Sequence, residues 1–559
     1  MDSQRPFLYL ALFFLGFLIW QQWTADHTPK SQPAVSTSQS ASKTASDAVA
    51  RDTGADIPSA NTPSAAQAPT AGTTSTAAPT VHVVTDVLDV TISTRGGDIT
   101  TVKLPTYPVS VEQKDIPLVL FSADKPYIAQ SGLLHDKTGA GWDKRAPNHY
   151  AMFTAEQTNY TLDGKEKVQV VMHWQSEDGV QVDKIFTFHK GEFHVDVDYQ
   201  VQNASGSNWV GREYMQLRRG KPVSKGSHLG GARSYFGAAY YDGKFHKLPL
   251  DKMAENPLKE TVTGGWVTMM QHYFLSAWIP SSPESENLLY SKVVNGAKGQ
   301  EYIIGLRSQA VTIPAGEKGM LHSRLYVGPT LQNKLASLAP GLELTIDYGI
   351  FTIFSKPLFW LLSKIHSLVG NWGWSIILLT VLVKGVFYKL SETSYRSMAK
   401  MKKVAPKIQA LKDRFGDDKQ AHQQAMMDLY KKEKINPLGG CLPILIQIPV
   451  FIALYWVLIE AVELRQAPWI LWIKDLSVRD PLFILPVIMG VSMFIQQKLN
   501  PPQPDPMMQK MMMAMPFIFT VFFAFFSSGL VLYWVVNNML SIAQQWYITR
   551  KLEKEGIKH

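Results

Sequence analysis

Hydrophobic residues are distributed unevenly along this chain of 559 residues. Its last third contains five long apolar runs, each near the roughly 20 residues that a transmembrane helix needs. A further run at 7–23 follows Arg5, and no small-x-small cleavage site follows it directly, so we expect an uncleaved membrane anchor. The pattern therefore predicts a polytopic α-helical membrane protein with six transmembrane helices, five of which form the core. The five expected core spans are 372–390, 438–464, 482–499, 511–527 and 529–549.

The section between the anchor and these spans changes character twice. Residues 25–80 are rich in Ser, Thr, Ala, Pro and Gln, and such a segment cannot bury a core, so we expect a flexible linker. Residues 81–330 show β patterning, most clearly at 193–202, where apolar and polar residues alternate strictly. Pairs such as Asp163-Gly164 provide turns between similar runs. We expect a large antiparallel β-sandwich domain here.

The charge distribution predicts the orientation of the spans. The loop at 391–436 holds eleven Lys or Arg against six Asp or Glu, and basic loops face the cytoplasm. Both termini are therefore expected in the cytoplasm and the β-domain outside it. We divide the chain into an anchor (1–24), a linker (25–80), the β-domain (81–330), an amphipathic interfacial segment (331–370), the five-helix core (371–549) and a basic tail (550–559).

The basic loop is itself patterned as two helices. Apolar residues recur every three or four positions on each side of Gly416, which predicts a helical hairpin at 391–436. Four lysines lie outside the apolar stripe: Lys400, Lys402, Lys403 and Lys407. They indicate either a docking platform for a ribosome, a receptor or an emerging chain, or a solvated hairpin whose charges only enforce orientation.

One span carries a lysine, Lys384, inside its apolar run. A charge at a helix centre costs about 2.5–3.5 kcal/mol, so such a residue usually faces a polar cavity or partner. Alternatively, its long side chain reaches the membrane interface. Polar residues recur within the spans, and they indicate either a wet groove or ordinary hydrogen bonds between helices. They include Thr380, Gln447, Gln497, Asn537, Asn538, Ser541 and, with aromatic rings, Tyr533 and Trp534.

Catalytic motifs are missing from the sequence. It has no phosphate-binding GxxxxGK[ST], no HExxH and no GxSxG motif, and it has a single cysteine. The domain's histidines, His173, His189, His194 and His272 among them, are scattered along expected strands without ligand-like spacing. We therefore expect no enzyme activity, no catalytic residue, no cofactor and no metal site.

Six short motifs resemble the YidC/Oxa/Alb family of membrane protein insertases, of the Gram-negative type. NPLGGCLP at 436–443, VELRQAP at 462–468 and SGLVLYW at 528–534 lie in or near the expected core. GGWV at 264–267, QHYF at 271–274 and LYVGP at 325–329 resemble the family's periplasmic domain. The resemblance extends from the first anchor nearly to the C-terminus.

This resemblance implies a non-enzymatic insertase and chaperone in the inner membrane, with a hydrophilic groove open to the cytoplasm and to lipid. The implied partners are nascent inner-membrane proteins, the Sec translocon, membrane lipids and, as further candidates, the ribosome and the signal recognition particle pathway, with no sequence-specific nucleic acid. The implied groove residues are Lys384, Thr380, Gln447, Gln497, Tyr533 and Trp534. The family usually carries arginine where this chain has Lys384.

Two other classes of function fit some of the same residues. A secondary transporter would bind an anionic solute at Lys384, although the spans show no evident inverted repeat. A membrane-anchored periplasmic scaffold would use the β-domain for binding and the helices only as an anchor.

Overall fold

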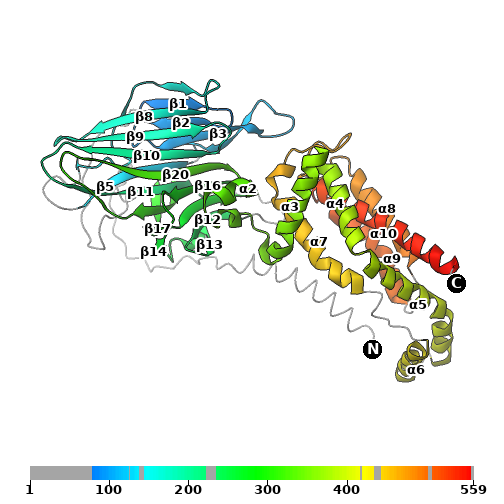
Figure 1. Cartoon of the computed structure of the whole chain (residues 1–559). Coiled ribbons are helices and arrows are strands. Elements are labelled where there is room, and N and C mark those ends of the chain that lie inside the picture. The colour runs from blue at the N-terminus through cyan, green and yellow to red at the C-terminus, as the bar shows by residue number, and fades with distance from the viewer. Residues whose placement is uncertain are drawn as a thin grey trace, which may run out of the picture.

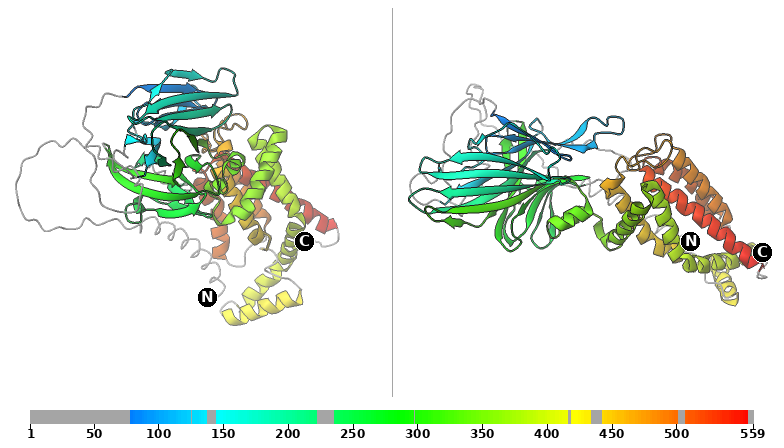
Figure 2. Two further views of the ribbon diagram at one scale, coloured as in Figure 1. Left: turned by 60° about the vertical axis from the view of Figure 1, so that its left-hand side comes forward. Right: turned by 45° about the horizontal axis from the view of Figure 1, so that its top comes forward.

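The computed structural model describes residues 78–124, 126–136, 144–221, 235–296, 298–415, 418–433, 442–500 and 506–554. The predicted anchor, residues 25–77 of the predicted linker and the end of the basic tail lie outside these residues. A β-rich part is followed by a helical part (Figure 1), and two further views show the same arrangement (Figure 2).

The β-rich part consists of two sheets. The eleven-stranded sheet contains β1 (Thr80–Val84), β2 (Asp89–Ser93), β3 (Ile99–Pro108), β4 (Pro117–Phe121), β5 (Tyr127–His135), β7 (Asn159–Thr161), β11 (Trp209–Gly220), β14 (Lys259–Thr263), β17 (Glu286–Gly296), β18 (Gly299–Ser308) and β19 (Val311–Ile313). The nine-stranded sheet contains β6 (Thr154–Ala155), β8 (Lys167–Gln175), β9 (Val180–His189), β10 (His194–Asn203), β12 (Phe236–Tyr241), β13 (Phe245–Leu248), β15 (Trp266–Gln271), β16 (Phe274–Pro280) and β20 (Lys318–Pro329).

The strand order combines hairpins between consecutive strands with crossovers between distant ones. The nine-stranded sheet runs β13-β12-β15-β16-β20-β10-β9-β8-β6, and the larger one runs β14-β17-β18-β11-β5-β3-β2-β1-β7, with β19 paired to β11 and β4 to β3. Among the described strand pairs, β1 and β7 alone run parallel. The predicted antiparallel β-rich domain is thus confirmed apart from this edge pair.

The alternation in the sequence corresponds to burial in the strands. Along β10, buried and half-buried residues alternate without exception, as the period of two predicts. At the turn before β8, Asp163 and Gly164 have φ of 42° and 77°. Both angles are positive, which a type I′ turn requires and which Asp and Gly tolerate better than most residues. The local sequence therefore specifies both the strand and the turn.

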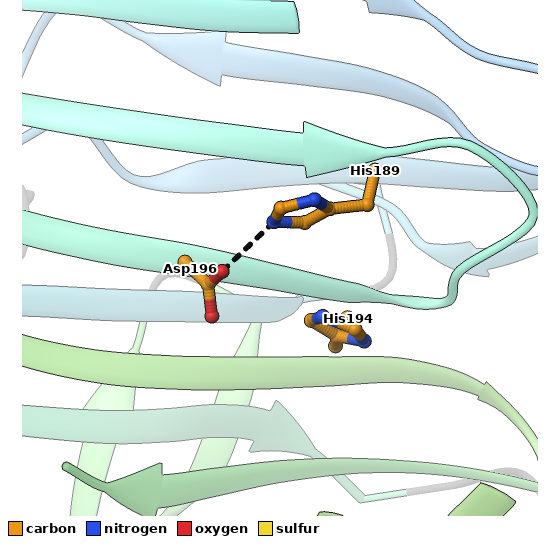
Figure 3. Close-up of side chains that lie close together, drawn as sticks. All are labelled: His189, His194 and Asp196. Carbon is orange, nitrogen blue, oxygen red and sulfur yellow. Dashed lines mark hydrogen bonds and ion pairs between the residues drawn. The ribbon is translucent and has the colours of Figure 1, made fainter. Parts of the chain in front are cut away.

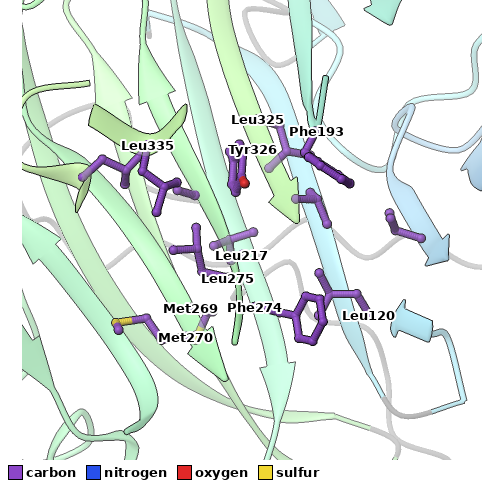
Figure 4. Close-up of a cluster of buried hydrophobic side chains, with 14 of the residues drawn as sticks. Leu120, Phe193, Leu217, Met269, Met270, Phe274, Leu275, Leu325, Tyr326 and Leu335 are labelled. Carbon is purple, nitrogen blue, oxygen red and sulfur yellow. The ribbon is translucent and has the colours of Figure 1, made fainter. Parts of the chain in front are cut away.

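The hydrophobic core lies between the two sheets and continues under the first helix. Buried side chains come from β4 and β11 of the larger sheet and from β15, β16 and β20 of the smaller one (Figure 4). Leu335 of α2 (Gln332–Leu338) is fully buried in the same cluster. The helix that follows the last strand is therefore part of the core of the β-rich part.

A buried lysine connects the two sheets. Lys184 of β9 donates hydrogen bonds from Nζ to the carbonyl oxygens of Gly96 at 2.8 Å, Gly97 at 3.2 Å and Ser131 at 3.1 Å, all on the facing sheet or its connections. Burial lowers the pKa of Lys184 to about 8, although Asp98 and Glu213 act in the opposite direction. All three ammonium N–H groups thus have an acceptor.

The helical part begins with short 3₁₀ turns, η3 (Leu342–Thr345) and η4 (Gly349–Phe351). The α-helices that follow are α3 (Thr352–Val369), α4 (Trp372–Val386), α5 (Tyr388–Phe415), α6 (Lys419–Lys432), α7 (Leu442–Glu460), α8 (Ile484–Leu499), α9 (Pro506–Phe523) and α10 (Ser528–Lys554), with η6 (Val462–Leu464) after α7.

By length and hydropathy, the described residues contain no single helix that meets the requirements for a membrane span, whereas α4 and residues 388–401 of α5 meet them together across a bend of 66°.

This bend corrects the span expected at 372–390. The helix ends at Val386, and the backbone N–H of Phe387 turns to the carbonyl oxygens of Val383 and Gly385. Glycine costs about 1 kcal/mol in a helix interior, so Gly385 favours an end here. The hairpin expected from residue 391 also begins earlier, because α5 starts at Tyr388 and runs without a break to Phe415.

We predict that replacing the buried lysine destabilises the β-rich part. A buried acceptor left without its donor costs about 1–3 kcal/mol, so Lys184→Met should lower the free energy of unfolding by about 2–5 kcal/mol. The measurement is thermal unfolding followed by the circular dichroism of the β-sheets. Lys167→Ala, at an exposed position of β8, should change stability by less than about 0.5 kcal/mol. Equal melting temperatures for the two variants would contradict the structural role of Lys184.

Candidate functional site

One face of α10 carries three polar side chains at intervals of four residues. Tyr533, Asn537 and Ser541 follow an i, i+4, i+8 pattern, which places them above one another on a helix. Asn538 lies on a different face and donates from Nδ2 to Ser492 Oγ of α8 at 3.1 Å. The polar residues of α10 therefore divide into a helix-pairing face and a second face.

Lys384, in the last turn of α4, contacts this second face. Its Nζ donates to Ser541 Oγ at 2.8 Å, and Ser541 Oγ donates to the Asn537 carbonyl at 2.7 Å. Within the described residues, no carboxylate forms an ion pair with Lys384, and this hydroxyl is its one hydrogen-bond acceptor. An ammonium carries three N–H groups, so two are free to take other acceptors.

Helices α5 and α7 complete the arrangement. Gln447 Nε2 of α7 donates to Asn537 Oδ1 at 2.9 Å, one turn along α10 from Tyr533. Tyr395 of α5 donates from its hydroxyl to the Ser541 carbonyl at 3.4 Å. Four helices thus contribute to one polar group, which we name the Lys384 cluster. Its members are Lys384, Tyr395, Gln447, Tyr533, Asn537 and Ser541.

Aromatic rings lie directly beside the cluster. The Phe451 ring of α7 lies 5.9 Å from Tyr533 and 4.6 Å from Trp534, measured between ring centroids. Phe523 of α9 lies 5.5 Å from Trp534 on another side. The buried Nε1 of Trp534 has no hydrogen-bond partner among the described residues. This indole N–H is therefore a second donor, beside the cluster, that the described residues leave unpaired.

Two residues named from the sequence lie apart from the cluster. Thr380 is 1% exposed, and its hydroxyl donates to the Ile376 carbonyl of its own helix at 2.6 Å. Gln497 is half-buried near the end of α8, and no described hydrogen bond joins it to the cluster. Tyr395 is a member of the cluster that was not predicted from the sequence. Its signal was weak, because one tyrosine in a basic helix shows no periodicity of its own.

The predicted hairpin consists of α5 and α6, which pack through Val404 and Ile408. Lys400 is exposed, whereas Lys407 Nζ lies 2.5 Å from Glu433 Oε1. The side chains of Lys402 and Lys403 lie outside the described residues. A docking role for these four lysines stays a prediction, and the ion pair leaves Lys407 a weaker candidate than Lys400.

Two histidines of the β-rich part lie closer together in space than their positions in the sequence indicate. His189 and His194 lie together with Asp196, with one potential ligand atom from each residue and all three atoms within 4.8 Å of one another (Figure 3). By contrast, His173 is paired with Asp183 at 2.7 Å, outside any such group. The expectation of scattered histidines is wrong for His189 and His194, because strand pairing brings together residues that are five apart in sequence.

Comparisons with known proteins cover nearly the whole described chain. A family model described as 60Kd inner membrane protein matches residues 364–555, and one described as YidC periplasmic domain matches residues 80–361. The chain is 54% identical over 564 residues to a membrane protein insertase YidC of Thioalkalivibrio sulfidiphilus, covering 100% of both chains. It is 48% identical over 570 residues to the protein of the same name from Pseudomonas putida strain W619, covering 99% of each.

A solved structure titled as an active YidC insertase with its first transmembrane domain resolved is also similar. It is 17% identical, with a TM-score of 0.37, over 84% of this chain and 95% of that chain.

We predict that the contact between α7 and α10 is energetically coupled. Double-mutant cycles on hydrogen bonds between membrane helices average about 0.6 kcal/mol, so Gln447→Leu and Asn537→Leu should show a coupling of about that size. Unfolding by a denaturing detergent in mixed micelles measures it. The matched control pairs Gln447→Leu with Asn538→Leu, whose amide contacts Ser492 instead, and it should be additive. Additivity in both cycles would contradict the described contact.

Proposed function

The chain belongs to the YidC family of membrane protein insertases, and we propose that it inserts nascent membrane proteins through a hydrophilic groove beside the Lys384 cluster. Family membership establishes an insertase rather than an enzyme, with nascent membrane proteins as substrates, a periplasmic β-rich domain and an inner-membrane location. The observation that carries the groove proposal is the ammonium of Lys384, which has one neutral acceptor among the described residues.

The cost of placing a cation among apolar helices supports this role. The cost is about 2.5–3.5 kcal/mol at a helix centre, and one serine hydroxyl offsets little of it. Water or a substrate's polar group must therefore supply the missing acceptors. The neighbouring amides Gln447 and Asn537 hydrogen-bond each other, so they form a polar wall next to the cation.

The proposed mechanism needs no nucleotide. The cation attracts an acidic or polar substrate tail into the groove, where the low dielectric strengthens the attraction. The substrate's own apolar span then leaves for lipid, because burial contributes about 0.8 kcal/mol per CH₂ group. The membrane potential adds about 2.3 kcal/mol per charge per 100 mV for acidic tails. Short tails with few charges pass unaided, whereas large or highly charged ones need the Sec translocon.

The same proposal includes the topology and the further partners. Six spans with both termini in the cytoplasm agree with the excess of basic residues at 391–436 and leave the β-rich domain in the periplasm. We keep the domain boundaries that were predicted from the sequence. The Sec translocon, lipids, the ribosome and the signal recognition particle pathway are proposed partners, with the hairpin as the ribosome-facing element.

Lysine in place of the family's usual arginine affects how a substrate is held. A lysine ammonium is a point charge on a flexible stem, whereas a guanidinium binds a carboxylate with two parallel hydrogen bonds. Lys384 therefore keeps the electrostatic attraction for a carboxylate but cannot form the two parallel hydrogen bonds. Thr380, Gln497, Tyr533 and Trp534 remain proposed groove residues. Full-length identity to insertases favours insertion over the transporter and scaffold alternatives.

We predict that the charge at position 384 decides function. In an insertase-depleted Gram-negative strain, the wild-type chain and Lys384→Arg should restore growth, because both carry a cation. Lys384→Glu should fail at equal membrane abundance, because it repels acidic tails, and Lys384→Ala shows how much an uncharged groove retains. Growth is measured by plating, and abundance by immunoblot. The control is Lys389→Glu, an exposed position at the start of α5, which should still restore growth.

If the wild-type chain and Lys384→Glu restore growth equally, insertase function stands but the groove cation is dispensable.

A further inference from the structure

A hairpin of the nine-stranded sheet brings two histidines and a carboxylate together. His194 and Asp196 are two residues apart on β10 and therefore point to the same face. His189 ends β9, and the register that pairs Val195 with Phe188 sets His189 opposite His194. The three side chains converge from both strands (Figure 3). The arrangement is fixed by the sheet and does not depend on a flexible loop.

The geometry fits a small cation. One potential ligand atom of each residue lies within 4.8 Å of the other two. Ligand atoms at Zn–N and Zn–O distances of 2.0–2.2 Å in a tetrahedral site lie about 3.4 Å apart. Small side-chain rotations therefore bring the three atoms to coordination distance. The side chains of His189, His194 and Asp196 are 33%, 14% and 15% exposed, so an ion has access without being fully solvated.

One nitrogen of His194 is unpaired, and the carboxylate of Asp196 is held in place by an arginine. His194 Nδ1 is buried without a hydrogen-bond partner among the described residues, and Glu192 Oε2 lies 3.7 Å from it. Leaving such an atom unpaired costs free energy that a ligand would recover. Asp196 Oδ1 accepts from Arg324 Nε at 2.7 Å, while Oδ2 lies 2.9 Å from His189 Nε2. The guanidinium thus orients the carboxylate so that Oδ2 faces His189.

We propose that His189, His194 and Asp196 form a site for a divalent transition metal ion of the zinc class. Imidazole and carboxylate suit Zn²⁺ and its neighbours, and hard cations such as Mg²⁺ prefer oxygen ligands alone. The ion takes the place of the proton that His189 and Asp196 share in their hydrogen bond. Water or Glu192 completes a fourth position. His322 is held by Asp198, with Nδ1 and Oδ1 2.5 Å apart, and its Nε2 lies 3.9 Å from Asp196 Oδ1, the oxygen that Arg324 also contacts.

The site lies where the β-rich domain meets the helix that leads towards the membrane part. In the β9–β10 turn, the Gly191 carbonyl accepts from Lys334 Nζ of α2 at 2.6 Å, and Glu192 Oε1 lies 3.1 Å from the same nitrogen. A bound ion therefore fixes the turn that holds α2. The concentration of the metal ion in the periplasm would therefore change the rigidity of this connection. This effect is independent of the groove and of Lys384.

The test is calorimetric titration of ZnCl₂ into the full-length protein in detergent, prepared without an oligohistidine tag. The chain has 14 histidines, so the readout is the difference between variants. Loss of an outer hydrogen-bond partner of a ligand costs about 10–100-fold in metal affinity, so loss of the ligand itself should exceed about 100-fold. We expect His189→Gln and His194→Gln each to bind one Zn²⁺ fewer per chain than the wild type.

The matched control is His173→Gln, which breaks a similar His–Asp pair outside the group and should bind as the wild type does. MgCl₂ should give no binding to the site. Equal Zn²⁺ binding by the wild type and both site variants would overturn the proposal, as would a wild type that binds no Zn²⁺ at micromolar concentration. If His194→Gln does not fold by circular dichroism, His189→Gln, at the more exposed end of β9, decides the question alone.

Discussion

A charged group removed from water must find other hydrogen-bond partners, and two lysines, the buried Lys184 and the half-buried Lys384, meet that constraint differently. Lys184, between the sheets, has a carbonyl acceptor for each of its three N–H groups. Lys384, between the helices, has a single hydroxyl among the described residues. A saturated cation stabilises a fold, and an unsaturated one is available to a ligand.

The two parts are connected by more than the chain. Arg465, just after η6, donates from a guanidinium nitrogen to the Pro108 carbonyl of β3 at 2.8 Å, and Gln466 donates to the same oxygen at 2.9 Å. Trp266 of β15 donates from Nε1 to the Pro340 carbonyl at 3.0 Å. Backbone acceptors keep their positions when side chains change, so these contacts hold the periplasmic domain at the end of the helical part.

Much of the fold could be predicted because period and composition are local properties. β10 follows directly from its alternating residues, and α7 to α10 follow from their apolar runs. The same alternation in β9 places Lys184 on the buried face, so the burial of this lysine was predictable from its strand. The bend at Phe387 was not predictable, because it depends on one backbone turn inside an apolar run.

The candidate site was predictable only in part. Lys384 and Gln447 stand out as polar residues in apolar runs, but nothing local shows that Ser541 is the acceptor for the lysine. That contact depends on which face of α10 meets α4. The meeting of His189 and His194 likewise depends on strand register and not on spacing. Local sequence patterns therefore did not predict which residues of different elements contact each other.

The most direct test of the central claim is photo-crosslinking from inside the proposed groove. A photoreactive residue replaces Ser541, next to the Lys384 ammonium, and a stalled nascent chain with a short acidic tail is presented to membranes. Val521, an exposed apolar position of α9, serves as the control. The account predicts crosslinks from position 541 to the tail and none from position 521 to it. If the same substrate inserts normally but its tail does not crosslink to position 541, the proposed groove is contradicted.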